Sequence, residues 1–120
     1  MKPLFALFVL LALCTAGSAA EIRKGAVMHV KPDAIWFEER GDLTRWQELK
    51  QALKKDGGAA ALAAYEQEKM SGRAAWQFLY RHTVKVLGVD RAKKQINVEM
   101  KTKGRFEGTT WFLDAAALTR

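Results

Sequence analysis

The sequence predicts an α+β fold, a small β-barrel of about five strands with an inserted helical hairpin. Three patterns lead to this prediction. Apolar and polar residues alternate near 26–31 and again from about 84 to 113, as in strands with one buried face. Between about 42 and 72 the apolar residues recur at helical spacing. Finally, Leu113 and Leu118 are two apolar residues five positions apart, with a short turn predicted between them.

Residues 1–20 have the features of a secretory signal peptide. Lys2 supplies a basic start, and Leu4–Leu13 form an apolar run. Ser18 and Ala20 are small residues that lie at the third and the first position before the expected cleavage point. We therefore expect cleavage after Ala20. An uncleaved anchor would need about twenty apolar residues. No other apolar stretch of that length follows, so no transmembrane segment is predicted in the mature chain.

The one cysteine of the chain, Cys14, would be lost with the signal peptide. Leu13 before it is too large for lipoprotein processing. The remaining residues, 21–120, are enough to form one domain with a modest core and no disulfide. A small exported domain without a disulfide is ordinary in a bacterial periplasm and unusual among extracellular animal modules. The sequence therefore predicts a periplasmic protein.

The first strand is predicted at Ala26–Lys31, which alternates and is rich in β-forming residues. Pro32-Asp33 breaks this strand as a turn, and Ala34–Glu39 resumes an extended segment. These two segments precede the helical region.

From Asp42 the apolar period becomes that of a helix. Asp42 is a candidate N-cap, and Gly57 can end the helix in the left-handed conformation. A weaker helical pattern covers Ala59–Met70 and ends before Ser71-Gly72. The first helix would bury one stripe, formed by Leu43, Trp46, Leu49 and Leu53. Together the two helices form a hairpin inserted between strands, at about 42–72.

After the helices the period returns to two. Two strands are predicted, each with one apolar face: Val84, Val86 and Gly88 on the first, and Ile96, Val98 and Met100 on the second. If Val86 pairs with Val98, the same register places Lys85 opposite Glu99, which is a favourable cross-strand pair. One register thus suits both faces of the sheet.

The next predicted strand is Thr109–Leu113, followed by a single 3₁₀ turn at 114–117 and a stub from Leu118. This order of strand, long loop, three-strand meander, 3₁₀ turn and stub resembles the small SH3-like barrels of exported bacterial proteins, with the helical hairpin in the long loop. Peptide-binding SH3 domains carry a tyrosine in the closing turn, where this chain has Ala117. Because this chain departs from the peptide-binding domains at that position, we expect no groove for proline-rich peptides.

The residues that could carry catalysis are few. His29 and His82 are far apart in the sequence and lack metal-ligand spacing. Glu38 and Glu39 are adjacent on an extended segment, so their carboxylates point to opposite faces and cannot act as a pair. No phosphate loop or dinucleotide fingerprint occurs. We expect no enzyme activity, no cofactor and no metal.

The positive charge of the chain is concentrated in one stretch. Between Arg81 and Arg105 there are eight basic and two acidic residues, a net charge of +6. Such a stretch can simply be a solvated face that keeps a strand edge from pairing. It can also bind an anionic cell-envelope component or an acidic protein, whereas nucleic acid is not expected in the periplasm. The candidate binding residues are Lys85, Arg91, Lys93, Lys94, Lys101, Lys103 and Arg105.

Two adjacent aromatic pairs lie on predicted strands, Trp36-Phe37 and Trp111-Phe112. Most aromatic residues of so small a domain are expected to fill its core. Neighbouring side chains on a strand point to opposite faces, however, so one member of each pair must face away from the barrel. If Trp111 is inward, Phe112 is outward, where either a helix covers it or it belongs to a binding surface. Trp36 and Phe112 complete the candidate binding residues.

Two classes of function remain open from the sequence. The first is a noncatalytic binding or adaptor module of the bacterial cell envelope, which would use a basic face on Arg81–Arg105. The alternative is a small periplasmic inhibitor or structural accessory protein that occupies a site on a partner protein. Such an inhibitor would display a protruding loop, and the segment Trp36–Asp42 is the candidate for it.

Overall fold

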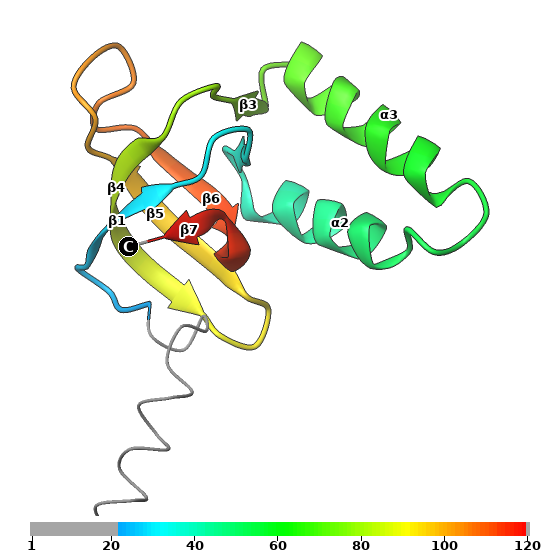
Figure 1. The fold of residues 1–120 in the computed structure, drawn as a ribbon, viewed down its shortest axis with the longest axis horizontal. Coiled ribbons are helices and arrows are strands. Elements are labelled where there is room, and N and C mark those ends of the chain that lie inside the picture. The colour runs from blue at the N-terminus through cyan, green and yellow to red at the C-terminus, as the bar shows by residue number, and fades with distance from the viewer. Residues whose placement is uncertain (1–21, 120) are drawn as a thin grey trace, which may run out of the picture.

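The computed structural model describes residues 22–119 as one antiparallel sheet with two helices (Figure 1). The predicted signal peptide lies outside the described residues. In chain order, the elements are β1 (Val27–Val30), β2 (Ile35–Phe37), α2 (Arg40–Gln51), α3 (Gly58–Ser71), β3 (Ala75–Gln77), β4 (His82–Asp90), β5 (Gln95–Met100), β6 (Thr110–Asp114), the 3₁₀ turn η2 (Ala115–Ala117) and β7 (Leu118–Thr119).

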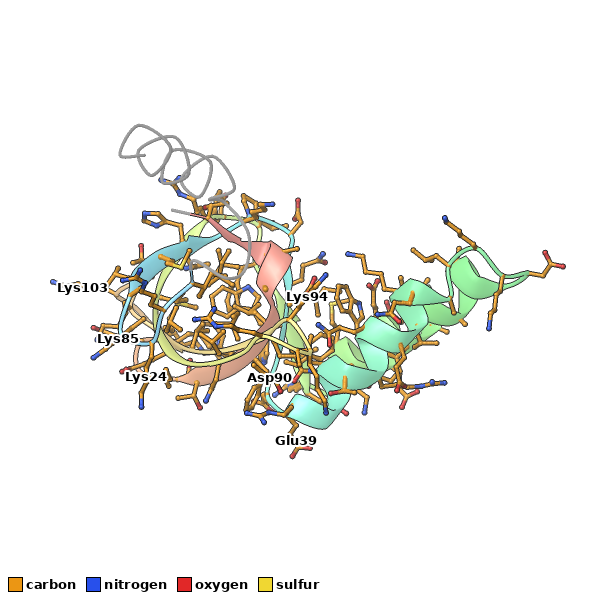
Figure 2. The ribbon with its side chains drawn as sticks, turned by 90° about the horizontal axis from the view of Figure 1, so that it is seen from below. Lys24, Glu39, Lys85, Asp90, Lys94 and Lys103 are labelled. Carbon is orange, nitrogen blue, oxygen red and sulfur yellow. The ribbon has the colours of Figure 1, made fainter. Side chains whose placement is uncertain are left out.

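The sheet has seven strands in the order β3-β2-β6-β5-β4-β1-β7, rather than the five or so expected. The difference comes from β3, which was not predicted, and from the last stub, which pairs with β1 and counts as β7. The outermost strands are β3 and β7, so the pairing does not close into a ring. Figure 2 shows that the sheet nevertheless curls around its inner side chains.

The central register agrees with the prediction. Val86 pairs with Val98 and Lys85 with Glu99, and Val98 lies opposite Trp111 on β6. One detail differs, because a bulge between Val86 and Gly88 places Gly88 opposite Asn97. The extra residue of a bulge shifts the side-chain alternation by one position. Gly88 therefore leaves the inner face on which Val86 lies.

Apolar side chains are buried on both faces of the sheet. Inside the curl lies one cluster: Ile22, Met28, Val30, Trp36, Val84, Val86, Ile96, Val98, Met100, Trp111, Leu113, Ala115 and Leu118. A second cluster lies between the sheet and the helices and consists of Phe37, Leu43, Trp46 and Ala75. Trp36 and Phe37 are neighbours on β2 and belong to different clusters, because successive side chains of a strand point to opposite faces of the sheet. The short strand β2 therefore contributes to both cores.

Helices α2 and α3 form the predicted hairpin, which projects to one side of the sheet (Figure 1). Helix α2 begins two residues before Asp42, with Glu39 at the N-cap position, so the capping prediction was wrong. Asp42 instead lies in the first turn, where its Oδ1 is 3.1 Å from Lys69 Nζ on α3. A carboxylate in this turn also interacts favourably with the helix dipole.

The apolar stripe predicted for α2 is buried only in its first half. Leu43 and Trp46 are buried, Leu49 is half-buried, and Leu53 beyond the helix is exposed. The reason is geometric, since the hairpin extends past the edge of the sheet and its tip has no sheet to cover it (Figure 1). Nearer the sheet, a polar contact joins the two helices, because Trp46 Nε1 donates to Glu66 Oε2 at 2.8 Å.

The predicted closing turn is present. After β6, η2 turns the chain at Ala115–Ala117, and β7 pairs Leu118 with Val30 on β1. The backbone N–H of Lys31 donates to the Ala117 carbonyl at 2.9 Å, which secures the turn against β1. Leu118 is buried, so the five-residue step returns the chain to the core.

Candidate binding surface

Exposed lysines lie on the outer surface of β4 and directly after β5. Lys85 on β4 lies opposite Val27 on β1 and opposite Glu99 on β5. Lys101 follows Glu99 by two residues and therefore has the same orientation, and its N–H donates to the Thr83 carbonyl on β4. These side chains form a solvent-facing strip across three strands.

Two further lysines extend this strip. Lys24 precedes Gly25, whose N–H donates to the Val86 carbonyl at 2.7 Å, so the segment before β1 lies against β4. Lys103 belongs to the β5–β6 loop. Figure 2 shows Lys24, Lys85 and Lys103 on the side of the curled sheet that faces away from the helices. We call the set Lys24, Lys85, Lys101 and Lys103 the basic face; all four are exposed.

The basic face retains a positive charge after its nearest carboxylate is counted. Glu99 lies between Lys85 and Lys101, and its Oε2 is 3.9 Å from Lys101 Nζ. An exposed pair at this distance is screened and contributes little to stability. The four lysines outnumber Glu99 and Glu107, the carboxylate in the loop of Lys103, so an excess of positive potential remains in front of the strands.

Arg105 belongs to the same β5–β6 loop as Lys103, whereas the other three predicted cations lie elsewhere. Arg91, Lys93 and Lys94 are in the β4–β5 turn, at the opposite end of the hairpin from Lys101. The six residues of β5 separate the two groups by about 20 Å at the usual rise per residue. In Figure 2, Lys94 and Asp90 lie next to the helices. The basic stretch is therefore continuous in sequence but forms two separate groups in space.

Helix α2 is attached to the backbone of this turn. Gln47 Nε2 donates to the Lys93 and Lys94 carbonyls at 3.1 and 3.2 Å and to Asp114 Oδ1 at 3.0 Å. Gln95, which is buried, donates from Nε2 to Gln47 Oε1 at 3.0 Å. A cleft of about 570 Å³ lies between α2 and the turn. The β4–β5 turn is therefore a site of contact between the sheet and the helical hairpin.

Trp36 and Phe112 do not belong to an exposed binding face. Trp36 is only 1% exposed, because its side of β2 faces the interior of the curl. Phe112 does point outward, as predicted, but it is half-buried against the second core cluster. The Arg40 guanidinium lies over its ring at 5.3 Å. Phe112 thus belongs to the contact between sheet and α2, which was one of its two predicted roles.

The segment Trp36–Asp42 does not form the protruding loop expected of an inhibitor. Trp36 and Phe37 are buried on β2, and Arg40 already belongs to α2. Only Glu38 and Glu39 connect the strand to the helix. The segment is therefore a strand-to-helix junction with its aromatic residues in the core.

An aromatic cluster links the β3–β4 connection to the β5–β6 loop. The ring of Phe106 lies 5.0 Å from that of Trp76 and 5.2 Å from that of Phe78. The Arg105 guanidinium lies over the Phe106 ring at 5.5 Å. Immediately after Phe78, Leu79 and Tyr80 are exposed at 72% and 77%. We call Leu79 and Tyr80 the apolar tip.

Sequence reasoning did not identify the apolar tip, although a signal was present. The run from Trp76 to Tyr80 contains four large apolar or aromatic residues in five positions. Side chains of an extended segment alternate between faces, so the core cannot accept all of them. Large exposed apolar side chains next to one another are informative, because single ones are common on protein surfaces and pairs are less so.

His82 lies beside this cluster, with its ring 4.6 Å from Phe78 and 6.0 Å from Trp36. Its Nδ1 is buried and has no hydrogen-bond partner within residues 22–119. Burial lowers the pKa of His82, because the charged imidazolium loses hydration there. His29 is on the outer face of β1, with Nδ1 3.2 Å from Thr83 Oγ1. In the described part of the chain, no three His, Cys, Asp or Glu side chains are grouped as metal ligands.

Comparison with known protein families, curated proteins and solved structures found no match for the chain. The fold and the surface therefore define it as a small α+β domain with a seven-stranded antiparallel sheet, a helical hairpin and a basic strand face. Neither helix between residues 22 and 119 is long and apolar enough to cross a bilayer.

Proposed function

We propose that the chain is a noncatalytic, exported binding module of the bacterial cell envelope, which holds an anionic partner on its basic face. The observation that carries this proposal is the grouping of Lys24, Lys85 and Lys103 on one side of the sheet, with Lys101 beside Glu99 and Thr83. Lysines grouped on one side of the sheet add their potentials, and that surface attracts an anionic partner without a deep pocket.

The SH3-like character of the domain belongs to the same proposal. The curled sheet, the η2 turn and the return of Leu118 to β1 support it. The helical hairpin lies after β2, which corresponds to a long loop of such barrels. With Ala117 in the closing turn and Trp36 in the core, recognition by charge fits this surface better than recognition of proline-rich peptides.

Location is part of the proposal as well. We propose export to the periplasm with cleavage after Ala20, on the basis of the basic, apolar and small-residue pattern of residues 1–20. Mass spectrometry of the N-terminal peptide from a periplasmic fraction tests this. A peptide starting at Glu21 supports export, and an intact peptide starting at Met1 in the purified protein rules out the cleavage.

Charge reversal tests the binding surface. The variant K24E/K85E/K101E changes three exposed lysines of the basic face, while K54E/K55E/K93E makes the same change in net charge at the hairpin tip and the β4–β5 turn. We expect the first variant to lose retention by bacterial envelope extract and the second to keep it. Equal retention by both variants, with both folded by circular dichroism, would assign binding to net charge or to another surface.

A further inference from the structure

The apolar tip extends the proposed function to a particular kind of partner. Leu79 and Tyr80 occupy the short connection between β3 and β4, and both side chains are mostly exposed. The residue before them, Phe78, is anchored: its ring packs on Phe106 at 5.2 Å and on Trp111 at 6.4 Å. The tip is therefore an exposed apolar pair held on a rigid aromatic base.

Cations surround this tip from two segments. Arg81 follows Tyr80 directly, and Lys101 donates its N–H to the Thr83 carbonyl two residues later. The β5–β6 loop packs on the base of the tip through Phe106, and this loop carries Lys103 and Arg105. All four side chains are exposed. Three carboxylates belong to the same surroundings: Glu107 of the loop, Glu99, whose Oε2 is 3.9 Å from Lys101 Nζ, and Asp33, whose N–H donates to the Phe78 carbonyl at 2.9 Å. Four cations against three carboxylates leave one net positive charge around the tip.

From this juxtaposition we infer that the apolar tip inserts into the interfacial region of an anionic phospholipid bilayer while the surrounding cations bind its headgroups. A tyrosine and a leucine beside arginines and lysines match the interface, where apolar groups reach the acyl boundary and long basic side chains extend to the headgroups. A bilayer also needs no groove on the protein, which suits a tip whose side chains are about three-quarters exposed.

Two contributions are expected to act together. Each lysine or arginine near an anionic leaflet strengthens binding by about fivefold, and this contribution weakens with salt. Burial of Leu79 and the ring of Tyr80 adds a contribution that salt does not screen. This inference rests on the proposed binding function and names its partner, with the apolar tip as an anchor next to the basic face.

Co-sedimentation of the purified full chain with lipid vesicles tests the inference. The vesicles are phosphatidylcholine alone, or phosphatidylcholine mixed with phosphatidylglycerol. Each protein is also prepared without residues 2–20, so that vesicle binding by the apolar run Leu4–Leu13 is separated from binding by the tip. We expect binding to the anionic vesicles, and a loss of at least about tenfold in L79S/Y80S. The control L53S removes another exposed apolar side chain, 39% exposed and far from the basic face, and should bind as the parent does.

A second readout does not depend on affinity. In a C14S background, an environment-sensitive fluorophore at L79C should shift to the blue on anionic vesicles, whereas the same label at L53C on the hairpin tip should not. Parent-like vesicle binding by L79S/Y80S would overturn the inference, as would equal binding of the parent to neutral vesicles. If the parent binds envelope extract cleared of membranes but does not bind vesicles, the proposed function of the basic face is supported and the bilayer inference is wrong.

Discussion

Trp111 on β6 lies directly opposite Val98 on β5, and both side chains are buried inside the curled sheet. Trp111 also keeps its indole N–H satisfied, because Nε1 donates at 2.7 Å to Oγ1 of Thr109, the residue just before β6. A tryptophan can be buried at this position only because its one polar atom finds an acceptor. The pair therefore fixes which face of β6 is the inner one.

Trp111→Ala should lower the free energy of unfolding by about 3–5 kcal/mol, as for large aromatic truncations in cores. The substitution leaves a cavity against Val98 and removes the ring contact with Trp36, whose centroid is 6.0 Å away. Urea unfolding followed by circular dichroism measures it. A loss below about 1 kcal/mol, the range of surface substitutions, would show that the inner face of β6 has been assigned incorrectly.

Gly58→Ala and Gly41→Ala should change stability in opposite directions. A Cβ at Gly58 would overlap the backbone carbonyl of Ala52, where the two helices meet, so we expect a loss of about 1–3 kcal/mol. Gly41 lies in the first turn of α2 with open space around its Cα, so alanine there should add about 0.5–1 kcal/mol. Thermal unfolding of the two variants against the parent measures both changes. Similar shifts in the two variants would contradict the close approach at Gly58.

Gln47→Ala should loosen the helical hairpin from the β4–β5 turn. The side-chain amide donates to Lys93, Lys94 and Asp114, so its loss should cost about 1–3 kcal/mol. Gln51 is exposed one turn later on α2 and lines the same cleft, so Gln51→Ala is the matched control, with a change under about 0.5 kcal/mol. Hydrogen exchange at Lys94 and Gln95 should speed up only in the Gln47 variant; unchanged exchange would mean that another contact holds the turn.

His82 should make stability fall in mild acid. Burial lowers its pKa in the folded state below the ordinary value of about 6.5. Below that value the unfolded chain takes up a proton that the folded chain resists. The stabilisation due to neutral His82 is therefore complete above about pH 6.5 and is lost as the pH falls through the lowered folded pKa. Urea unfolding at several pH values should show this fall in the parent.

His82→Phe keeps a ring against Phe78 and Trp36 but cannot titrate, so the fall in stability should be smaller in this variant. His29→Gln, which changes the histidine on the outer face of β1, is measured beside it for comparison. An unchanged slope in His82→Phe would mean that other groups cause the acid sensitivity.

The central strands could be predicted from the sequence because two independent signals agree there. Val86 and Val98 require the inner face, and Lys85 and Glu99 suit the outer one, so a single register satisfies both. Strand β3 gave no comparable signal, since three residues are too few to show a period, and the strand exists through its pairing with β2. The bulge at Gly88 likewise depends on backbone geometry that alternation does not encode.

The surface was predicted less well, for a physical reason. In the sequence, residues 81–105 form one basic stretch. In a β-hairpin, however, the residues of the turn lie at one end, and the residues that follow the second strand lie at the other end. Lys93 and Lys101 are therefore far apart although eight positions separate them. Trp36 was misassigned because β2 is covered on both faces, so that both members of an adjacent aromatic pair are buried.

The salt dependence of binding tests the proposed function most directly. The parent protein and K24E/K85E/K101E are titrated with bacterial envelope extract from low to roughly physiological ionic strength, where the screening length shrinks to about 8 Å. If the basic face holds an anionic partner, parent binding falls steeply with salt, and the variant binds weakly with a shallower dependence. Parent binding that does not change with salt, or a variant that follows the same curve as the parent, would contradict the account.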